Sequence, residues 1–196
     1  TNNTDKIAQT TAGIVILLDH LVARPIDENT FYSLDWAAEM YTELGNNASF
    51  LGSRPPPDAV GYYRKAIKTY RAMIEAARND SAFAPDLDAI FTVRMKMADC
   101  LCRLGYYESA VESIVRVLKV QNNLIGPQRK VASIYQAWGA ENPKAYLYAI
   151  RGGDPSEENG KSVVWGWGGI AKRVISDETL SDLLHEARYN LALCRY

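Results

Sequence analysis

Hydrophobic residues recur every three or four positions along most of the chain, and strict alternation of apolar and polar residues is nearly absent. The first spacing places apolar side chains on one face of a helix, whereas alternation would indicate strands. The pattern therefore predicts an all-α fold. The expected helices cover residues 5–23, 30–45, 57–78, 86–104, 107–121, 126–139, 142–151 and 178–196, with a shorter one near 167–175.

Residues with strong terminal preferences support these boundaries. Side chains that accept a hydrogen bond from a free backbone N–H favour helix starts, and proline favours the first turn. Such residues are Asp27 or Asn29, the prolines of "PPPD" at 55–58, Asp86 and Asp177. Glycine closes helices because it adopts left-handed backbone angles easily. We expect helix ends at Gly45, Gly105, Gly139 and the pair Gly152–Gly153.

The most apolar run is "AGIVILL", Ala12–Leu18, near the N-terminus. It is much shorter than the roughly 20 residues that a membrane span needs. It also lacks the preceding basic segment and the following small-residue cleavage site of a signal peptide. We therefore expect a buried helix and no membrane span.

An internal repeat is visible around the glycines. Gly105 and Gly139 are 34 residues apart, and each follows an alanine, Ala98 or Ala132, by seven residues. A further alanine and glycine have the same offset at 38 and 45. The corresponding blocks are "AAEMYTELG", "MADCLCRLG" and "VASIYQAWG", and a partial copy, "LALCRY", begins at Leu191. Self-similarity at this period predicts stacked helical repeats.

This pattern resembles the tetratricopeptide repeat, a 34-residue helix–turn–helix. The family has a small residue at position 8, matched by Ala38, Ala98, Ala132 and Ala192. Its glycine at 15, aromatic at 17 and alanine at 20 are best matched by Gly105, Tyr107 and Ala110. A "WGWG" insert followed by "EARYNLALCRY" is similar to segments of large bacterial proteins of this family. The resemblance implies an antiparallel helix-pair solenoid.

The repeat residues have clear physical roles. Small side chains let paired helices approach closely, so Ala98 and Ala132 are expected in helix contacts with no room for a larger group. We expect one domain, residues 1–196, of three or four irregular repeats, and a longer parent chain. Insertions are expected at about 46–61, 79–88 and 152–177, with exposed loops at 46–57 and 152–163. A helical bundle without repeats is the alternative.

Composition and charge narrow the possible functions only a little. The 196 residues are 47% hydrophobic and 23% charged, with a net charge of −1, which does not favour nucleic acid as a partner. Three cysteines, Cys100, Cys102 and Cys194, do not form a disulfide framework and are expected as reduced, buried thiols. This usage is compatible with the cytoplasm.

No motif in the chain predicts catalysis, a cofactor or a metal. His20 and His185 lie on separate expected helices, which does not suit metal binding. Gly160-Lys161-Ser162 is not a phosphate loop, because Pro155 stands where the motif needs glycine and no strand precedes it. Trp165 and Trp167 are expected to pack the insert onto its neighbours, and a small-ligand platform is the alternative.

The family resemblance implies a binding surface on the first helix of each repeat. Its concave face is formed there by positions 2, 5, 6, 9, 12 and 13. The candidate residues are Tyr32, Asp35, Trp36, Glu39 and Glu43 in the first copy, Lys96, Asp99 and Arg103 in the second, and Arg129, Lys130, Ser133 and Gln136 in the third. The last copy adds Glu186, Tyr189, Asn190 and Leu193.

These residues predict a groove with an acidic, aromatic end and a basic end, in which a protein or peptide partner docks in one direction. The family's clamp for terminal carboxylates is not matched, because Met95 and Asp99 stand at its positions 5 and 9. The expected function is a non-catalytic interaction or scaffolding module. A helical accessory domain of a larger enzyme and a small-ligand binder at the tryptophan insert are the alternatives.

Overall fold

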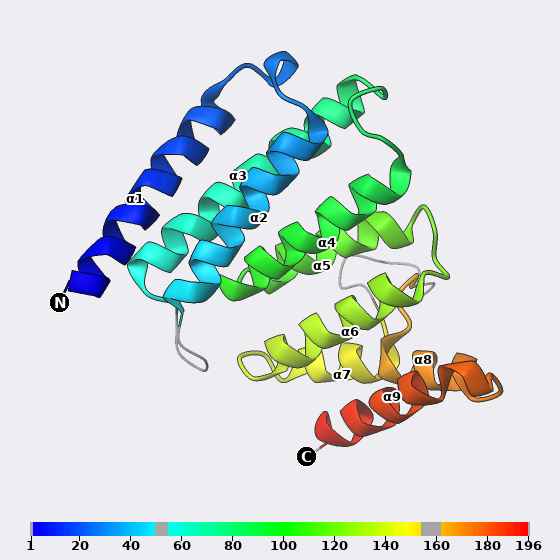
Figure 1. Ribbon diagram of the computed structural model, residues 1–196. Coiled ribbons are helices and arrows are strands. Elements are labelled where there is room, and N and C mark those ends of the chain that lie inside the picture. The colour runs from blue at the N-terminus through cyan, green and yellow to red at the C-terminus, as the bar shows by residue number, and fades with distance from the viewer. Residues whose placement is uncertain (1, 50–54, 154–161, 196) are drawn as a thin grey trace. The chain divides into compact units, whose positions relative to one another are not determined.

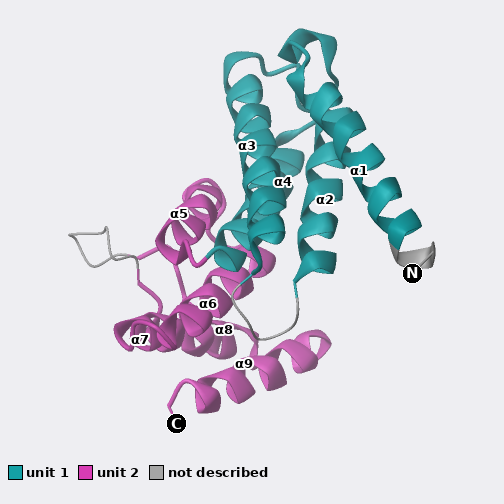
Figure 2. Ribbon diagram, turned by 90° about the vertical axis from the view of Figure 1, so that its left-hand side faces the viewer, with its two compact units in different colours: residues 1–104 teal, residues 105–196 magenta. Residues whose placement is uncertain are grey.

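The computed structural model describes residues 2–49, 55–153 and 162–195, and within these ranges the regular structure is entirely helical. The all-α prediction is confirmed. The chain folds into two compact units, residues 1–104 and 105–196 (Figure 2).

Unit 1 contains α1 (Asn2–Ala23), a short 3-10 helix (Ile26–Glu28), α2 (Phe31–Ala48), α3 (Pro57–Asn79) and α4 (Leu87–Arg103). Helices α2 and α3 run antiparallel and side by side, α3 also packs on α4, and α1 packs on α2 (Figure 1). The centre of the unit is unusually rich in tyrosine. Its fully buried side chains include Ala38, Tyr41, Tyr63, Ala66 and Tyr70.

Unit 2 contains α5 (Tyr107–Leu118), α6 (Ile125–Gly139), α7 (Lys144–Arg151), α8 (Gly166–Val174), a 3-10 helix (Glu178–Leu180) and α9 (Ser181–Leu193). Helix α6 packs against α5, α7 and α8, and α9 packs on α8. The short helix expected near 167–175 is confirmed. Side chains at the centre of the unit include Ala132, Tyr135, Ala145, Trp167 and Ile170.

Helix α1 is not the buried helix that its sequence suggested. Leu18 is fully buried, but Ile7, Ile16 and Leu17 each expose about 60% of their surface. The helix is apolar on more than one face, and only one face packs on α2. Among the residues described, its segment Asp5–Ala23 is long and apolar enough to cross a membrane, with mean hydropathy 1.3 and 6% of it buried. This is a property of length and composition, which signal sequences share.

The helix starts expected at Asp86 and at the prolines of 55–57 are confirmed, whereas those of α2 and α9 differ. Asp177 caps the 3-10 helix Glu178–Leu180, and α9 begins at Ser181 without a side-chain cap. Asp86 caps α4 through a 2.7 Å bond from the Ala89 amide, as expected. Helix α2 is capped by Thr30 instead of Asp27 or Asn29, in a reciprocal capping box with Ser33. The Asn29 side chain donates to the carbonyl oxygens of Leu21 and Pro25, so it closes the end of α1.

The repeated glycines have two different roles. Gly105 has a φ of 76°, the left-handed conformation expected after a helix end. Gly45 instead lies inside α2, and Gly139 is the last residue of α6 without a positive φ. A Cβ at Gly45 would lie 2.7 Å from the Tyr63 ring, and one at Gly139 would lie 2.5 Å from the Tyr146 ring. These two glycines are needed because a tyrosine of the next helix packs against the backbone.

The small repeat positions are confirmed in three of four copies. Ala38, Ala98 and Ala132 have no exposed surface. The fourth position is wrong, because Ala192 is exposed and Ala187 is the buried alanine of α9. The position expected for the last copy is therefore wrong at Ala192, and the face assigned from it to Glu186, Tyr189, Asn190 and Leu193 does not follow.

The loops expected at 46–57 and 152–163 are only partly loops. Residues 46–48 continue α2, and α3 already starts at Pro57. Gly152 is packed, because a Cβ there would overlap the Val164 carbonyl oxygen. The Tyr135 hydroxyl donates to the Gly153 carbonyl, so the second segment is fixed where it leaves α7. Residues 50–54 and 154–161, including Pro155, lie outside the described residues.

Candidate functional site

The outward face of α2 presents two aromatic side chains one helical turn apart. Tyr32 is 69% exposed and Trp36 is 46% exposed. The opposite face of the helix packs in the core, because Leu34, Ala38 and Tyr41 are buried. Residues four apart lie on the same side of a helix, so the two rings form one aromatic surface.

Next to these rings, Lys96 of α4 is held by two carboxylates of α2. Its Nζ lies 2.8 Å from Asp35 Oδ2 and 2.7 Å from Glu39 Oε1. Burial alone would lower the pKa of Lys96, but the hydrogen bonds and negative charges of Asp35 and Glu39 raise it overall. The predicted separation of these charges is wrong, since Lys96 lies between the two acidic residues and not towards an opposite end.

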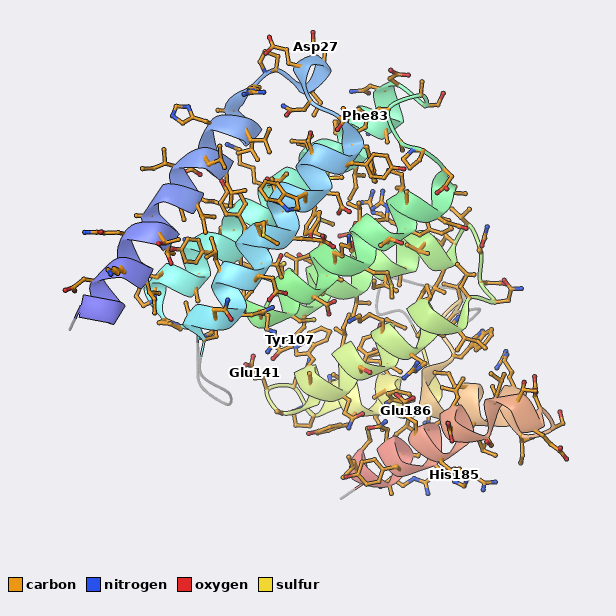
Figure 3. All side chains as sticks on the ribbon, in the orientation of Figure 1. Asp27, Phe83, Tyr107, Glu141, His185 and Glu186 are labelled. Atoms are coloured by element: carbon orange, nitrogen blue, oxygen red, sulfur yellow. The ribbon has the colours of Figure 1, made fainter. Side chains whose placement is uncertain are left out.

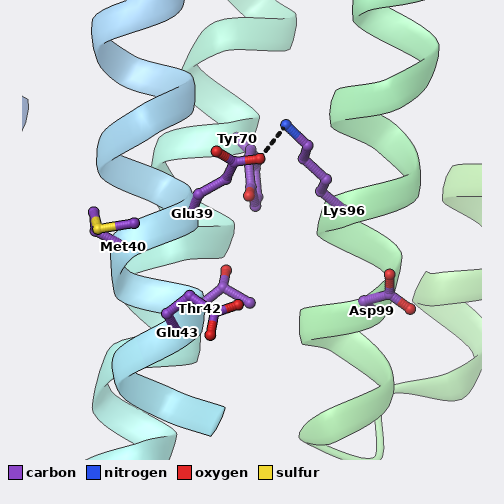
Figure 4. A pocket seen from close by; sticks show the side chains of 7 residues that line it. All are labelled: Glu39, Met40, Thr42, Glu43, Tyr70, Lys96 and Asp99. Atoms are coloured by element: carbon purple, nitrogen blue, oxygen red, sulfur yellow. Dashed lines mark ion pairs between the residues drawn. The ribbon is translucent and has the colours of Figure 1, made fainter. Parts of the chain in front are cut away.

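A pocket of about 370 Å³ opens between α2, α3 and α4, and Glu39 and Lys96 of this ion pair are part of its lining. Figure 4 shows Glu39 and Glu43 on α2 with Lys96 and Asp99 opposite them on α4. Tyr70 of α3 contributes a buried ring, and its burial raises the pKa of the phenol above the usual value. The complete lining is Glu39, Met40, Thr42, Glu43, Tyr70, Lys96 and Asp99.

The chemistry beside this pocket is not that of an activated nucleophile. The Cys100 sulfur lies 3.3 Å from the Thr42 hydroxyl, and burial raises the pKa of the thiol to about 11. A reactive cysteine requires the opposite shift, towards thiolate at neutral pH. Within the described parts of the chain, no three His, Cys, Asp or Glu side chains gather as a metal site would require.

The corresponding face of α6 in unit 2 is largely occupied by its own unit. Arg129 Nη2 lies 2.6 Å from Glu186 Oε2 of α9, and Figure 3 shows Glu186 on the side of α9 towards α6. Gln136 accepts a 2.9 Å hydrogen bond from the Trp167 indole. The Ser133 hydroxyl donates to the Arg129 carbonyl oxygen. Arg129 and Gln136 thus bond to other helices of unit 2.

A second α6 side chain, the buried amide of Gln128, also holds the tryptophan insert. Gln128 is fully buried, and its Nε2 donates to the carbonyl oxygens of Asn122 and Val163 at 2.8 Å. Its Oε1 accepts from the Trp165 amide. Trp167 is 1% exposed, and the Arg173 guanidinium lies 4.1 Å from the centre of the Trp165 ring. The packing role expected for these tryptophans agrees with this geometry.

The structure brings together part of the predicted set. Asp35, Glu39, Glu43, Lys96 and Asp99 gather on α2 and α4, with Tyr32 and Trp36 on the same helix as the first three. Arg103 is exposed on the last turn of α4. The four α6 residues, Arg129, Lys130, Ser133 and Gln136, belong to unit 2.

Sequence reasoning missed Tyr70 and Gln128. Tyr70 lies on α3, and the repeat pattern directed attention only to the first helix of each pair. Gln128 had a usable signal, because it stands four residues before Ala132, where the first copy has the apolar Leu34. A polar residue at a core position indicates a specific buried partner.

Comparison with known proteins finds no matching family model, curated protein or solved structure.

Proposed function

We propose that this chain is a non-catalytic interaction module of tetratricopeptide-repeat type, and that it binds a protein or peptide segment on the α2–α4 face of unit 1. The repeat assignment is supported by the shared packing of Ala38 and Ala132 and by the matching glycine–tyrosine contacts. A stacked-helix architecture offers an extended surface suited to such binding.

The observation that carries the proposal is the exposed aromatic surface beside the pocket. Contiguous exposed apolar patches mark interaction sites, and tryptophan and tyrosine are both enriched at binding hot spots. Tyr32 and Trp36 meet this description, and the pocket lined by Glu39 and Glu43 adjoins the same helix face. The tryptophans of unit 2 are a weaker candidate, since Trp167 is buried and Arg173 covers Trp165.

A display library of random twelve-residue peptides, selected on the purified chain, tests the proposal. Enriched peptides are then measured by fluorescence anisotropy against wild type, Trp36→Ala and Tyr32→Ala. Tyr189→Ala is the matched control, because Tyr189 is 65% exposed on α9 of the other unit. We expect the two α2 variants to weaken binding at least about tenfold and the control to leave it unchanged.

Circular dichroism establishes that each variant keeps its helix content. If no peptide is enriched, or if the enriched peptides bind Trp36→Ala and Tyr32→Ala as tightly as wild type, the proposed function at this face is wrong.

A further inference from the structure

The α2 face carries rings and carboxylates on successive turns, and this order constrains what can bind. Tyr32 and Trp36 are followed along the same face by Glu39, Met40 and Glu43. Trp36 and Glu43 are seven residues apart, which is about 10 Å along a helix axis. An occupant that contacts both ends must therefore present an apolar group and a polar group about 10 Å apart.

The charge of the pocket decides the sign of the polar group. Its lining includes three carboxylates, Glu39, Glu43 and Asp99, and one ammonium, Lys96. Lys96 is already balanced, because it bonds both Asp35 and Glu39. Glu43 is exposed, and among the described residues the neutral Asn46 amide donates to it at 3.4 Å. The field at the Glu43 end is therefore negative, and it attracts a cation and repels an anion.

The aromatic surface favours the same kind of group. Arginine and lysine are attracted to the faces of tryptophan and tyrosine as well as to carboxylates. Arginine in addition forms paired hydrogen bonds to a carboxylate. In a peptide in the polyproline II conformation, residues three apart lie on the same side and about 9 Å apart, because this helix has three residues per turn. That spacing is close to the rise of about 10 Å along α2 from Trp36 to Glu43.

Resting on the proposed function, we propose that this face recognises a basic peptide segment, in which an aromatic or large apolar residue stands three positions from an arginine or lysine. The apolar side chain lies on Trp36 and Tyr32, and the cationic side chain enters the pocket beside Glu43. This is opposite in sign to a site for an acidic segment or a terminal carboxylate.

The random peptide library supplies the first readout, which is the charge of the enriched sequences. One enriched peptide is then synthesised in three forms, with arginine, glutamine or glutamate at the cationic position. Each form is titrated against wild type, Glu43→Lys and the control Glu141→Lys, which reverses an exposed charge in unit 2. We expect the arginine form to bind wild type at least about tenfold tighter than the glutamate form, and this preference to shrink with added salt.

Glu43→Lys should invert the preference, so that the glutamate form gains affinity while the arginine form loses it. Glu141→Lys should leave both affinities unchanged. Enrichment of acidic or uncharged peptides that still require Trp36 would overturn the basic-segment inference and leave the proposed function intact. An unchanged preference in Glu43→Lys would also overturn the inference, and the absence of any Trp36-dependent peptide would overturn both.

Discussion

Helix pairs α2–α3 and α6–α7 use the same core residues and present very different outer faces. In each pair, an alanine, a tyrosine and a glycine at the same spacing are buried against the next helix: Ala38, Tyr41 and Gly45 in one, and Ala132, Tyr135 and Gly139 in the other. In each, a tyrosine ring of the second helix lies against the glycine.

The outer faces differ because the chain continues differently after each pair. The α6 face is covered by unit 2 itself, through Glu186, Trp167 and the segment that Gln128 holds. The α2 face keeps Tyr32 and Trp36 exposed and borders the pocket. The shared alanine–tyrosine–glycine spacing therefore accompanies similar inner contacts, whereas the segments that follow each pair leave the α6 face covered and the α2 face exposed.

The largest change in the free energy of unfolding is expected at the core position where helix pairs α2–α3 and α6–α7 differ most. Gln128 occupies the position of Leu34 in the repeat, and Gln128→Leu would leave the Trp165 amide and the Asn122 and Val163 carbonyls without their partner. Unsatisfied buried groups of this kind should cost about 2–4 kcal/mol in the free energy of unfolding. Urea titration measures the loss, and the summed emission of the four tryptophans should shift to the red as the burial of Trp167 is lost.

Leu34→Ala is the matched variant in unit 1, where the deletion removes only apolar contacts. Leu34→Ala should destabilise the protein without the red shift of the tryptophan emission in the folded state. If Gln128→Leu is as stable as wild type, the insert is held by other contacts and the contrast between the two pairs is incorrect.

A second prediction concerns the small repeat positions. Ala132→Leu and Ala38→Leu should each lower the free energy of unfolding by about 1–3 kcal/mol, because neither side chain has any exposed surface and the neighbouring helix must move. Ala192→Leu is the control, since this alanine is exposed, and it should change stability by less than about 0.5 kcal/mol. Urea titration of the three variants measures these changes, and equal losses at all three positions would restore the original register of the last copy.

The third prediction compares the two contacts between a glycine and a tyrosine ring. The contacts have similar geometry, but the two rings differ in how easily they can move away. Gly45→Ala should destabilise by about 1 kcal/mol, because Tyr63 is fully buried and its hydroxyl donates to Asn46 Oδ1, so the ring cannot withdraw. Gly139→Ala should be close to neutral, because Tyr146 is only partly buried and can rotate outward. Thermal denaturation of both variants tests the difference, and an equal cost would show that the Tyr146 ring is as constrained as the Tyr63 ring.

These contacts also show how far the sequence could predict the structure. Helix positions follow from the periodic apolar residues, and the buried alanines follow from the repeat, because both depend on local spacing. The role of Gly45 does not, since a glycine chosen for a left-handed turn and one chosen for a close tyrosine look identical in sequence.

The errors in the candidate site have a related cause. The attraction between Lys96 and the two α2 carboxylates depends on residues about 60 positions apart, and no periodicity records it. The exposure of α1 was likewise not predictable. An apolar helix is expected to be buried, but its own sequence does not identify the element that packs on it. The exposure of Tyr32 and Trp36 could be predicted, since their spacing relative to Ala38 places them on the side of α2 away from this buried alanine.

The smallest change in stability is expected at the hydroxyl groups of Tyr41 and Tyr135, which donate to different acceptors in the two helix pairs. The Tyr41 hydroxyl donates to Asp19 of α1 at 2.6 Å, whereas that of Tyr135 donates to the Gly153 carbonyl. Burial alone would raise the pKa of Asp19, but hydrogen bonds from Lys65 and Tyr41 and the charge of Lys65 lower it overall. Because the folded protein holds the ionised form, this contribution to stability is fully present above the unfolded pKa of about 3.8 and is lost as the pH falls below it.

Asp19→Asn should therefore remove part of the stability at neutral pH and make the remaining stability less sensitive to acid below pH 4. Tyr135→Phe should lower stability at every pH without changing that acid sensitivity, because its acceptor is a backbone carbonyl that does not titrate there. Urea midpoints of wild type, Asp19→Asn and Tyr135→Phe between pH 3 and 7 measure the effect, which is small because Asp19 and Lys65 are both partly exposed. If wild type and Asp19→Asn lose stability in parallel over this range, Asp19 does not tie α1 to the α2–α3 pair through its charge, and the contact of Leu18 with the core must be what holds α1 in place.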